Sequence, residues 1–311
     1  MSVVNKENSV PVQVDDEIDL RELFAVLWRG KWIITLTTVL AAAIAVFVAL
    51  SLPNIYRSEA LVAPVNAENG GLGGLASKYG AIAGLAGISL PSGGSDKTSL
   101  GLQILQSRQF FESFVKEHDI LVPLMAARKW DVSSGLEIND ELYDQNSGQW
   151  LREAKPPRGS EPSIQEAHEV FVKLLSTSQD KESGLVTIAI EHISPVVAQQ
   201  WVEWLVADIN RTVRAQDVSQ AERSIAYLEE QIRSTSLAEL QAGFFDLIQS
   251  QIETMMLAKA TPEYLFKTID PAVVPELKVK PKRSLIAALG VVLGGMLGCL
   301  IVLVRHYAFA K

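Results

Sequence analysis

Asp270-Pro-Ala-Val-Val-Pro-Glu-Leu-Lys-Val-Lys-Pro-Lys-Arg-Ser284 leads into residues 285–304, which carry no charge, and Arg305-His306 follow. About 20 apolar residues, rising 1.5 Å each, cross the roughly 30 Å hydrocarbon core of a bilayer. We therefore predict a transmembrane helix at residues 284–304 and a cytoplasmic tail at 305–311. The stretch before it is rich in proline, with Pro271, Pro275 and Pro281.

Three glycines in this span, Gly290, Gly294 and Gly298, are spaced four residues apart. Small residues at this spacing form a groove along one helix face, so that another helix can approach closely. Glycine is also common in transmembrane helices without such a role. Because three glycines are in phase, we predict that this glycine face packs on another helix.

A second uncharged run covers residues 32–52. It is too long for the apolar part of a signal peptide, so we interpret it as a retained transmembrane helix. Trp28 and Trp32 suit the membrane interface, and Arg29 and Lys31 favour a cytoplasmic N-terminus. Two spans then put both termini in the cytoplasm and residues 53–283 in the periplasm. The basic residues before the second span make the number of positive charges equal on the two sides of the membrane. The predicted orientation therefore rests on the residues that flank the first helix.

Composition excludes several kinds of site. The net charge of −8 argues against nucleic acid as a partner, since phosphate binding needs a basic face. Cys299, the only cysteine, lies inside the second span, which excludes an internal disulfide and a cysteine metal site. The four histidines have no metal-ligand spacing, and no GxxxxGK[ST] phosphate loop occurs. We expect neither a cofactor nor a metal ion.

The intervening chain predicts an α+β body. Residues 1–31 end in a short amphipathic helix, and 56–65 form a strand. The glycine-rich residues 68–95 favour a loop or a short helix at 76–87 over a nucleotide site. The other expected elements are helices at 100–116, 119–127 and 163–175, a polar excursion at 128–162, a hairpin of 175–180 with 185–192, and a strand at 264–269. We expect a small, membrane-proximal mixed sheet.

The longest helix pattern runs over residues 195–234. Ser194 is a suitable N-cap and Pro195 fits the first helical position. The 39 residues from 196 to 234 would reach roughly 58 Å at 1.5 Å per residue, so this helix should project from the body. A capping box from Ser236 to Glu239 predicts a break and a return helix at 237–260.

Apolar residues in the second half of the long helix recur at heptad spacing. Its main members are Val218, Ile225, Leu228 and Ile232. A helix this long cannot bury both faces in one small domain, so an apolar stripe should meet a neighbouring subunit. We predict that these residues form an oligomer interface.

No catalytic constellation is legible. Asp140, Glu141 and Asp144 form a carboxylate cluster, which we interpret as a solvated acidic loop. Trp201 and Trp204 could stack a sugar ring, but tryptophans at helical spacing are more often core residues. We therefore predict no catalytic residue and disfavour an enzyme.

Three stretches resemble one family, the Wzz-type chain-length determinants, which are polysaccharide co-polymerases. The first is residues 16–32, beginning Asp16-Glu-Ile-Asp-Leu. The second joins Asp270-Pro-Ala-Val-Val-Pro275 and Pro281-Lys-Arg283 to the glycine face. The third runs from Ser194-Pro-Val-Val-Ala-Gln-Gln-Trp201 through Tyr227-Leu-Glu-Glu-Gln231.

The resemblance implies a two-pass protein of the bacterial inner membrane with a periplasmic body. It implies a ring-shaped homo-oligomer, often an octamer, that is not an enzyme. Its partners would be membrane lipids, a separate polysaccharide polymerase and a lipid-linked glycan, with lipopolysaccharide O-antigen favoured, whose modal length it would control. The alternatives are a periplasmic sensor, which would normally continue into a cytoplasmic signalling domain, and a membrane-anchored glycan-modifying enzyme.

Overall fold

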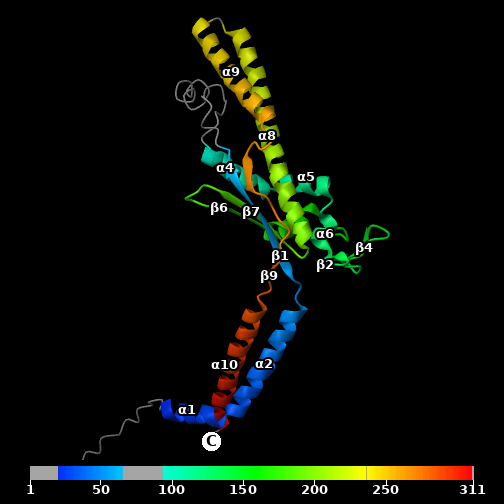
Figure 1. Cartoon of the computed structure of the whole chain (residues 1–311), viewed down its shortest axis with the longest axis vertical. Helices are drawn as coiled ribbons and strands as arrows, with labels where there is room; N and C mark the ends of the chain where they lie inside the picture. The colour runs from blue at the N-terminus through cyan, green and yellow to red at the C-terminus, as the bar shows by residue number, and fades with distance from the viewer. Residues whose placement is uncertain (1–19, 66–93, 236, 310–311) are drawn as a thin grey trace, which may run out of the picture. The chain divides into compact units, whose positions relative to one another are not determined.

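The computed structural model describes residues 20–65, 94–235 and 237–309 (Figure 1). The chain folds into two compact units, which we call the span unit (residues 1–52 and 281–311) and the body (53–280). The glycine-rich loop or short helix expected before residue 94 and the capping serine Ser236 lie outside the described residues.

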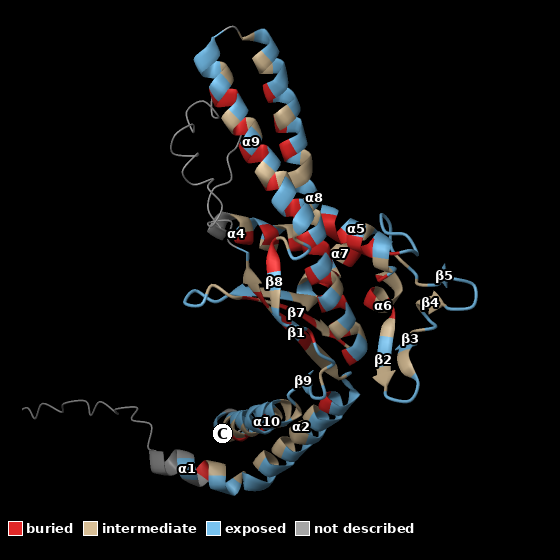
Figure 2. Ribbon diagram, turned by 45° about the horizontal axis from the view of Figure 1, so that its top comes forward, coloured by how far each residue is buried: buried red, intermediate tan, exposed pale blue. Residues whose placement is uncertain are grey.

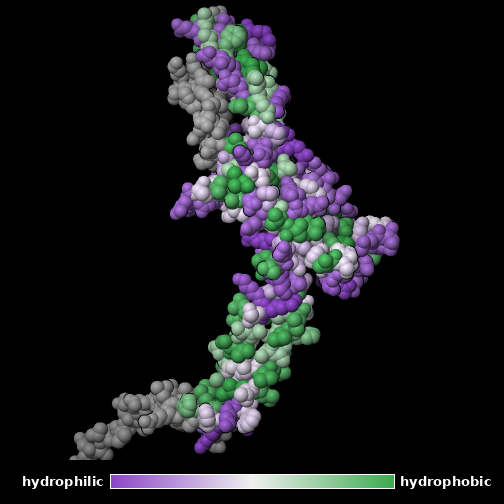
Figure 3. Space-filling model, in the orientation of Figure 1, coloured by the Kyte–Doolittle hydropathy of each residue, from purple (hydrophilic) through white to green (hydrophobic). Residues whose placement is uncertain are grey.

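The span unit contains α1 (Leu20–Arg29), α2 (Lys31–Ser51) and α10 (Arg283–Phe309). By length and composition, α2 and α10 can each cross a membrane. Hydrophobic residues cover both helices on the face seen in Figure 3. Trp32 and Phe47 on α2 are exposed, as expected for side chains that meet lipid rather than protein.

The body is built on an antiparallel sheet. Its strands are β1 (Ile55–Pro64), β6 (Leu175–Gln179), β7 (Val186–His192), β8 (Phe266–Asp270) and β9 (Lys278–Lys280). The order is β6-β7-β1-β8. β8 pairs with the second half of β1, and β9 pairs with the first two residues of β1. Every pairing among the described strands of this sheet is antiparallel, so the expectation of a mixed sheet was wrong.

Short helices cover one side of this sheet. They are α4 (Gly94–Leu105), α5 (Arg108–His118), α6 (Leu121–Met125) and α7 (Ile164–Leu174). The single helix expected at 100–116 is in fact two, α4 and α5. Ser107 ends the continuity because its hydroxyl accepts a hydrogen bond from the amide of Phe110 at 3.2 Å and caps a new helix.

The polar excursion carries two small hairpins. Their strands are β2 (Ala127–Asp131) with β3 (Gly135–Ile138), and β4 (Tyr143–Asp144) with β5 (Gln149–Trp150). The excursion is tied to α7 by Arg152, whose guanidinium donates to both carboxylate oxygens of Glu166 at 2.6 and 2.8 Å. This contact holds the pKa of Glu166 below its usual value.

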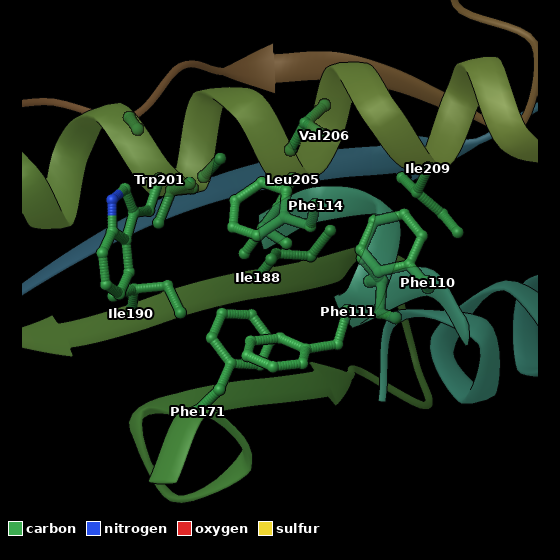
Figure 4. Close-up of a cluster of buried hydrophobic side chains, with 14 of the residues drawn as sticks. Phe110, Phe111, Phe114, Phe171, Ile188, Ile190, Trp201, Leu205, Val206 and Ile209 are labelled. Atoms are coloured by element: carbon green, nitrogen blue, oxygen red, sulfur yellow. The ribbon is translucent and has the colours of Figure 1, made fainter. Parts of the chain in front are cut away.

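One hydrophobic core joins the helices to the sheet (Figure 4). The first half of α8 (Pro195–Ser234) lies along β7 and presents Trp201, Leu205 and Ile209. These side chains meet three phenylalanines from α5, Phe171 from α7, and Ile188 and Ile190 from β7. Because apolar residues of α8 are surrounded here by helices and sheet, this half of the helix is part of the body's core.

The second half of α8 leaves this core and pairs with α9 (Ala238–Ala260). Figure 2 shows the two helices projecting from the sheet as a hairpin, with buried residues on their facing sides. The 40 residues of α8 correspond to about 60 Å. The chain then returns through β8, which is fastened to α8 by the buried Asn210. Its side-chain oxygen accepts from the amides of Leu265 and Phe266 at 2.7 and 2.8 Å.

Candidate packing and assembly site

The glycine face of α10 lies against α2. A Cβ added to Gly294 would sit 2.6 Å from the Cβ of Ala41, and one added to Gly298 would sit 2.9 Å from the Cα of Ile34. A Cβ on Gly290 would collide with the side chain of Ala45. Atoms cannot approach this closely, so glycine is needed at all three positions for the helices to touch backbone to backbone.

Polar groups reinforce this contact. The hydroxyl of Thr37 lies 3.4 Å from the carbonyl oxygen of Gly294 and also donates to carbonyls within α2 at 3.0 Å. At the other end of the pair, Arg283 donates from Nε to the carbonyl oxygen of Ala49 at 3.1 Å. That carbonyl belongs to the last turn of α2, where backbone oxygens lack helical partners. The glycine face is thus occupied within the chain.

The α8–α9 hairpin has a seam of its own. On α8 it consists of Ala221, Ser224 and Leu228. On α9 the facing buried residues recur every three or four positions: Phe244, Leu247, Gln251, Thr254 and Ala258. This is heptad spacing, so α9 supplies the partner that the apolar stripe of α8 requires.

A second stripe on α9 has no partner among the described residues. Phe245, Ile252 and Met256 lie outside the buried seam and are all exposed, Met256 at 64%. They follow each other by seven and four residues, which keeps them on one helix face. We call Phe245, Ile252 and Met256 the outer face of α9.

A network of charged side chains joins α5 to α8. His118 lies 2.8 Å from a carboxylate oxygen of Asp208, and its ring stacks on Trp204 with centroids 4.2 Å apart. Arg211 donates to both Asp208 and Glu117 at 2.6 Å. The network is buried at Asp208 and reaches solvent at Glu117.

The sequence analysis did not find this network, because Glu117 and Asp208 are far apart in the chain. Ligand atoms of Glu117, His118 and Asp208 lie within 4.8 Å of one another, close enough for a metal ion. The guanidinium of Arg211 is ion-paired with both carboxylates. The arrangement therefore acts as an ion-paired clamp between two helices. Its only sequence signal was the i,i+3 spacing of Asp208 and Arg211.

Comparison with protein families finds two matches. Residues 16–118 match the model described as "Wzz: Chain length determinant protein", and residues 247–307 match "G-rich domain on putative tyrosine kinase". The first begins at Asp16, where the resemblance noted above begins, and the second includes the glycine face. The chain therefore contains a Wzz chain-length determinant domain, followed by a G-rich domain.

Two solved structures are similar to this chain. One is a "full-length bacterial polysaccharide co-polymerase", at 14% identity, covering 94% of this chain and 99% of that one, with a TM-score of 0.43. The other is a fragment of WzzB, the polysaccharide co-polymerase from Salmonella Typhimurium, at 12% identity, covering 73% and 100%, with a TM-score of 0.28. No curated protein sequence matched.

The proline-rich segment of the chain connects β8 to α10. Pro271 and Pro275 lie between β8 and β9, and Pro281 lies between β9 and α10. Proline has no amide proton to donate to a sheet, so the returning chain pairs with β1 in two short pieces instead of one strand. In the gap, the carbonyl oxygen of Val273 accepts from the hydroxyl of Ser58 at 2.8 Å.

The predicted oligomer interface needs a correction. Leu228 is fully buried inside the chain against α9, so it cannot contact a neighbouring subunit. Val218, Ile225 and Ile232 are half-buried. The sequence could not distinguish a partner helix in the same chain from one in another chain, because both require the same heptad pattern.

The two tryptophans and Asp144 of the acidic cluster take part in packing or in a turn. Trp201 is 1% exposed and belongs to the core, and Trp204 packs on His118. Asp144 accepts from the amide of Asn146 at 2.9 Å and the hydroxyl of Ser147 at 2.6 Å. These bonds lower the pKa of Asp144 and close the β4–β5 turn. Asp140 and Glu141 are exposed beside it.

Proposed function

We propose that this protein sets the modal chain length of a bacterial surface polysaccharide. The polysaccharide that we favour is the O-antigen of lipopolysaccharide. The protein would set this length without catalysis, as an oligomeric scaffold in the inner membrane beside a separate polymerase. Family membership supports chain-length control. The fold supports a scaffold, because its distinctive features are packing surfaces.

The single observation that carries the proposal is how the body is joined to the two spans. β1 begins at Ile55, soon after α2 ends at Ser51, and β9 ends at Lys280, shortly before α10 begins at Arg283. Ile55 and Lys280 are paired in the sheet. A body held on two short tethers stays beside the membrane and raises the effective concentration of whatever it binds there.

For the topology, we propose that both termini are cytoplasmic and that the body is periplasmic. Arg29 at the end of α1 and Lys31 at the start of α2 support this orientation. Reporter fusions at Lys6 and Lys311 should then report the cytoplasm, and a fusion at Gly148 the periplasm. A cytoplasmic signal from Gly148 would reverse the assignment.

For the assembly, we propose that subunits meet through the outer face of α9 and the half-buried Val218, Ile225 and Ile232 of α8. Exposed apolar side chains in a row are expected to find a partner. Replacing Ile252 and Met256 together by glutamate should split the detergent-purified oligomer, as measured by mass photometry. Ala226→Glu is the control, because Ala226 is exposed on α8 away from the buried seam. If only the control variant dissociates, the interface lies on the opposite side of the hairpin.

Glycan profiles test the function itself. Deleting the gene should give surface glycans of uncontrolled length, seen as a loss of the modal band on a gel. The Ile252→Glu/Met256→Glu variant should shift or abolish the mode. Alanine at Asp140, Glu141 or Asp144 should leave polymerisation intact, because no proton transfer is assigned to them. If deletion stops glycan synthesis, or one carboxylate variant does so with the oligomer intact, the protein is an enzyme instead.

A further inference from the structure

The tethers restrict which end of the body lies near the membrane. Ile55 follows Ser51 by four positions in the chain, and a fully extended chain of that length reaches at most about 14 Å. Only Pro281 and Lys282 lie between Lys280 and Arg283. Because Ile55 and Lys280 are paired, both tethers leave from one end of the sheet. With α2 and α10 in a bilayer, this end of the body stays close to the bilayer surface.

The β2–β3 hairpin lies at this same end of the body. Trp130 of β2 packs edge-on against Tyr56, the second residue of β1, with ring centroids 5.5 Å apart. Figures 1 and 2 both show β2 near β9. The turn between β6 and β7 is at the other end, because Val186 pairs with Val62 whereas His192 pairs with Tyr56.

The hairpin presents apolar and basic groups that nothing in the described body covers. Val132 at its tip is 86% exposed, and Arg128 and Lys129 on β2 are also exposed. Leu277, next to the exposed Lys278 of β9, is 83% exposed. A half-buried tryptophan ring beside exposed aliphatic and basic side chains suits the boundary between lipid headgroups and acyl chains.

The tip is preformed. The carboxylate of Asp131 accepts from the amide of Ser133 at 2.9 Å and from its hydroxyl, and Gly135 supplies a positive φ of 78°. These bonds also lower the pKa of Asp131, so its charge is held in the turn. Glu137 stands opposite Lys129 across the hairpin. The hairpin itself is therefore close to neutral, and its apolar tip is the feature that distinguishes it.

We propose that the β2–β3 hairpin docks on the bilayer surface, with Val132 entering the boundary between headgroups and acyl chains and Arg128 and Lys129 meeting lipid phosphates. This contact is separate from the two spans and gives the body a third point of attachment. It does not depend on which glycan the protein handles. The occupant is lipid because the tethers bring this end of the body to the bilayer, whatever proteins lie nearby.

The test uses the full chain in vesicles. Cys299→Ser removes the only cysteine, and Val132→Cys then gives one site for an environment-sensitive fluorophore. The vesicles contain phosphatidylethanolamine and phosphatidylglycerol with a fraction of nitroxide lipid labelled near the top of the acyl chain. Both leaflets are alike, so either orientation of the protein gives the same signal. Lys181→Cys on the β6–β7 turn is the matched control, exposed but at the far end of β1.

We expect a severalfold loss of fluorescence at Val132→Cys and none at Lys181→Cys. Ser134→Cys, next to the tip, should give an intermediate loss and serves if Val132→Cys does not fold. Arg128→Glu with Lys129→Glu should weaken the quenching at the tip. If Val132→Cys and Ser134→Cys are quenched no more than Lys181→Cys, the proposal is overturned. Protection of the tip from aqueous iodide without quenching by lipid would also overturn it, since that result would indicate a protein partner.

Discussion

The α2–α10 pair and the α8–α9 pair are both antiparallel helix pairs that use small residues, but they make contact differently. Between α2 and α10 the glycine face brings backbone against backbone. Between α8 and α9, large side chains such as Leu228, Phe244 and Leu247 fill the space. Lipid is as apolar as leucine, so a membrane pair gains little from burying leucine and depends on close packing. In water, burying apolar surface contributes about 25 cal/mol per Å².

The largest expected effect is in the water-exposed pair. Leu228→Ala removes a fully buried side chain from the seam and should cost about 3 kcal/mol. Because the hairpin has contacts on one side only, we expect the loss as local opening. Hydrogen exchange should speed up in α9 and the second half of α8 but not around Trp201. Tyr227→Ala, at an exposed neighbour, is the control, and equal acceleration in both variants would contradict the account.

The membrane pair should respond to added volume instead. Gly294→Leu forces a side chain into the backbone of α2, at a cost of about 1–3 kcal/mol for overpacking. Thermal unfolding in detergent should report lower stability, and Gly290→Leu should add to it. Gly295→Leu is the control, because its nearest neighbour across the pair is the Thr38 hydroxyl at 3.7 Å. If Gly294→Leu is no worse than Gly295→Leu, the glycine face is incidental.

Acidification should lower the stability of the body, which distinguishes the body from the two helix pairs. Burial lowers the pKa of His192, and its Nδ1 accepts from the amide of Ser194 at 3.0 Å, which requires the neutral ring. As the pH falls below about 6.5, the unfolded chain takes up a proton that the folded chain refuses, so stability is lost. We expect a loss on the order of 1 kcal/mol between pH 7 and 5.5.

His192→Gln is the matched variant for this effect. It lacks the titrating ring, so it should show a smaller change in unfolding free energy over the same pH range, even if it is less stable throughout. Parallel pH profiles for the two proteins would assign the acid sensitivity to other groups.

The smallest expected effect has the opposite sign. The hydroxyl of Ser250 is buried in the α9 seam without a hydrogen-bond partner. Ser250→Ala removes this unpaired group and raises helix propensity, so it should stabilise the hairpin by up to about 1 kcal/mol. Chemical denaturation and hydrogen exchange of α9 would detect this gain. A loss of stability would show that the hydroxyl has a partner, such as bound water.

Local patterns in the sequence predicted much of this fold. The long helix was expected at 195–234 and α8 runs from Pro195 to Ser234, because Ser194 caps its start and apolar spacing continues throughout. The two spans were predicted from the length of their uncharged apolar runs, and the β6–β7 hairpin was predicted from two neighbouring strand patterns. The break at Ser107 was missed, because apolar spacing continues across it while a hydroxyl ends the helix. β9 was missed because three residues, two of them lysines, make no strand pattern.

Residue order alone therefore established what each segment is: an apolar span, a capped helix, a glycine face, a heptad stripe. These are properties of neighbours in the chain, and the physics that sets them is local hydrogen bonding and helical spacing. Which segments meet was settled only in three dimensions. Leu228 is covered by α9 instead of another subunit, Glu117 and Asp208 share Arg211, and Trp130 reaches Tyr56. The same apolar stripe or charge can be satisfied by several partners, and the packed chain selects among them.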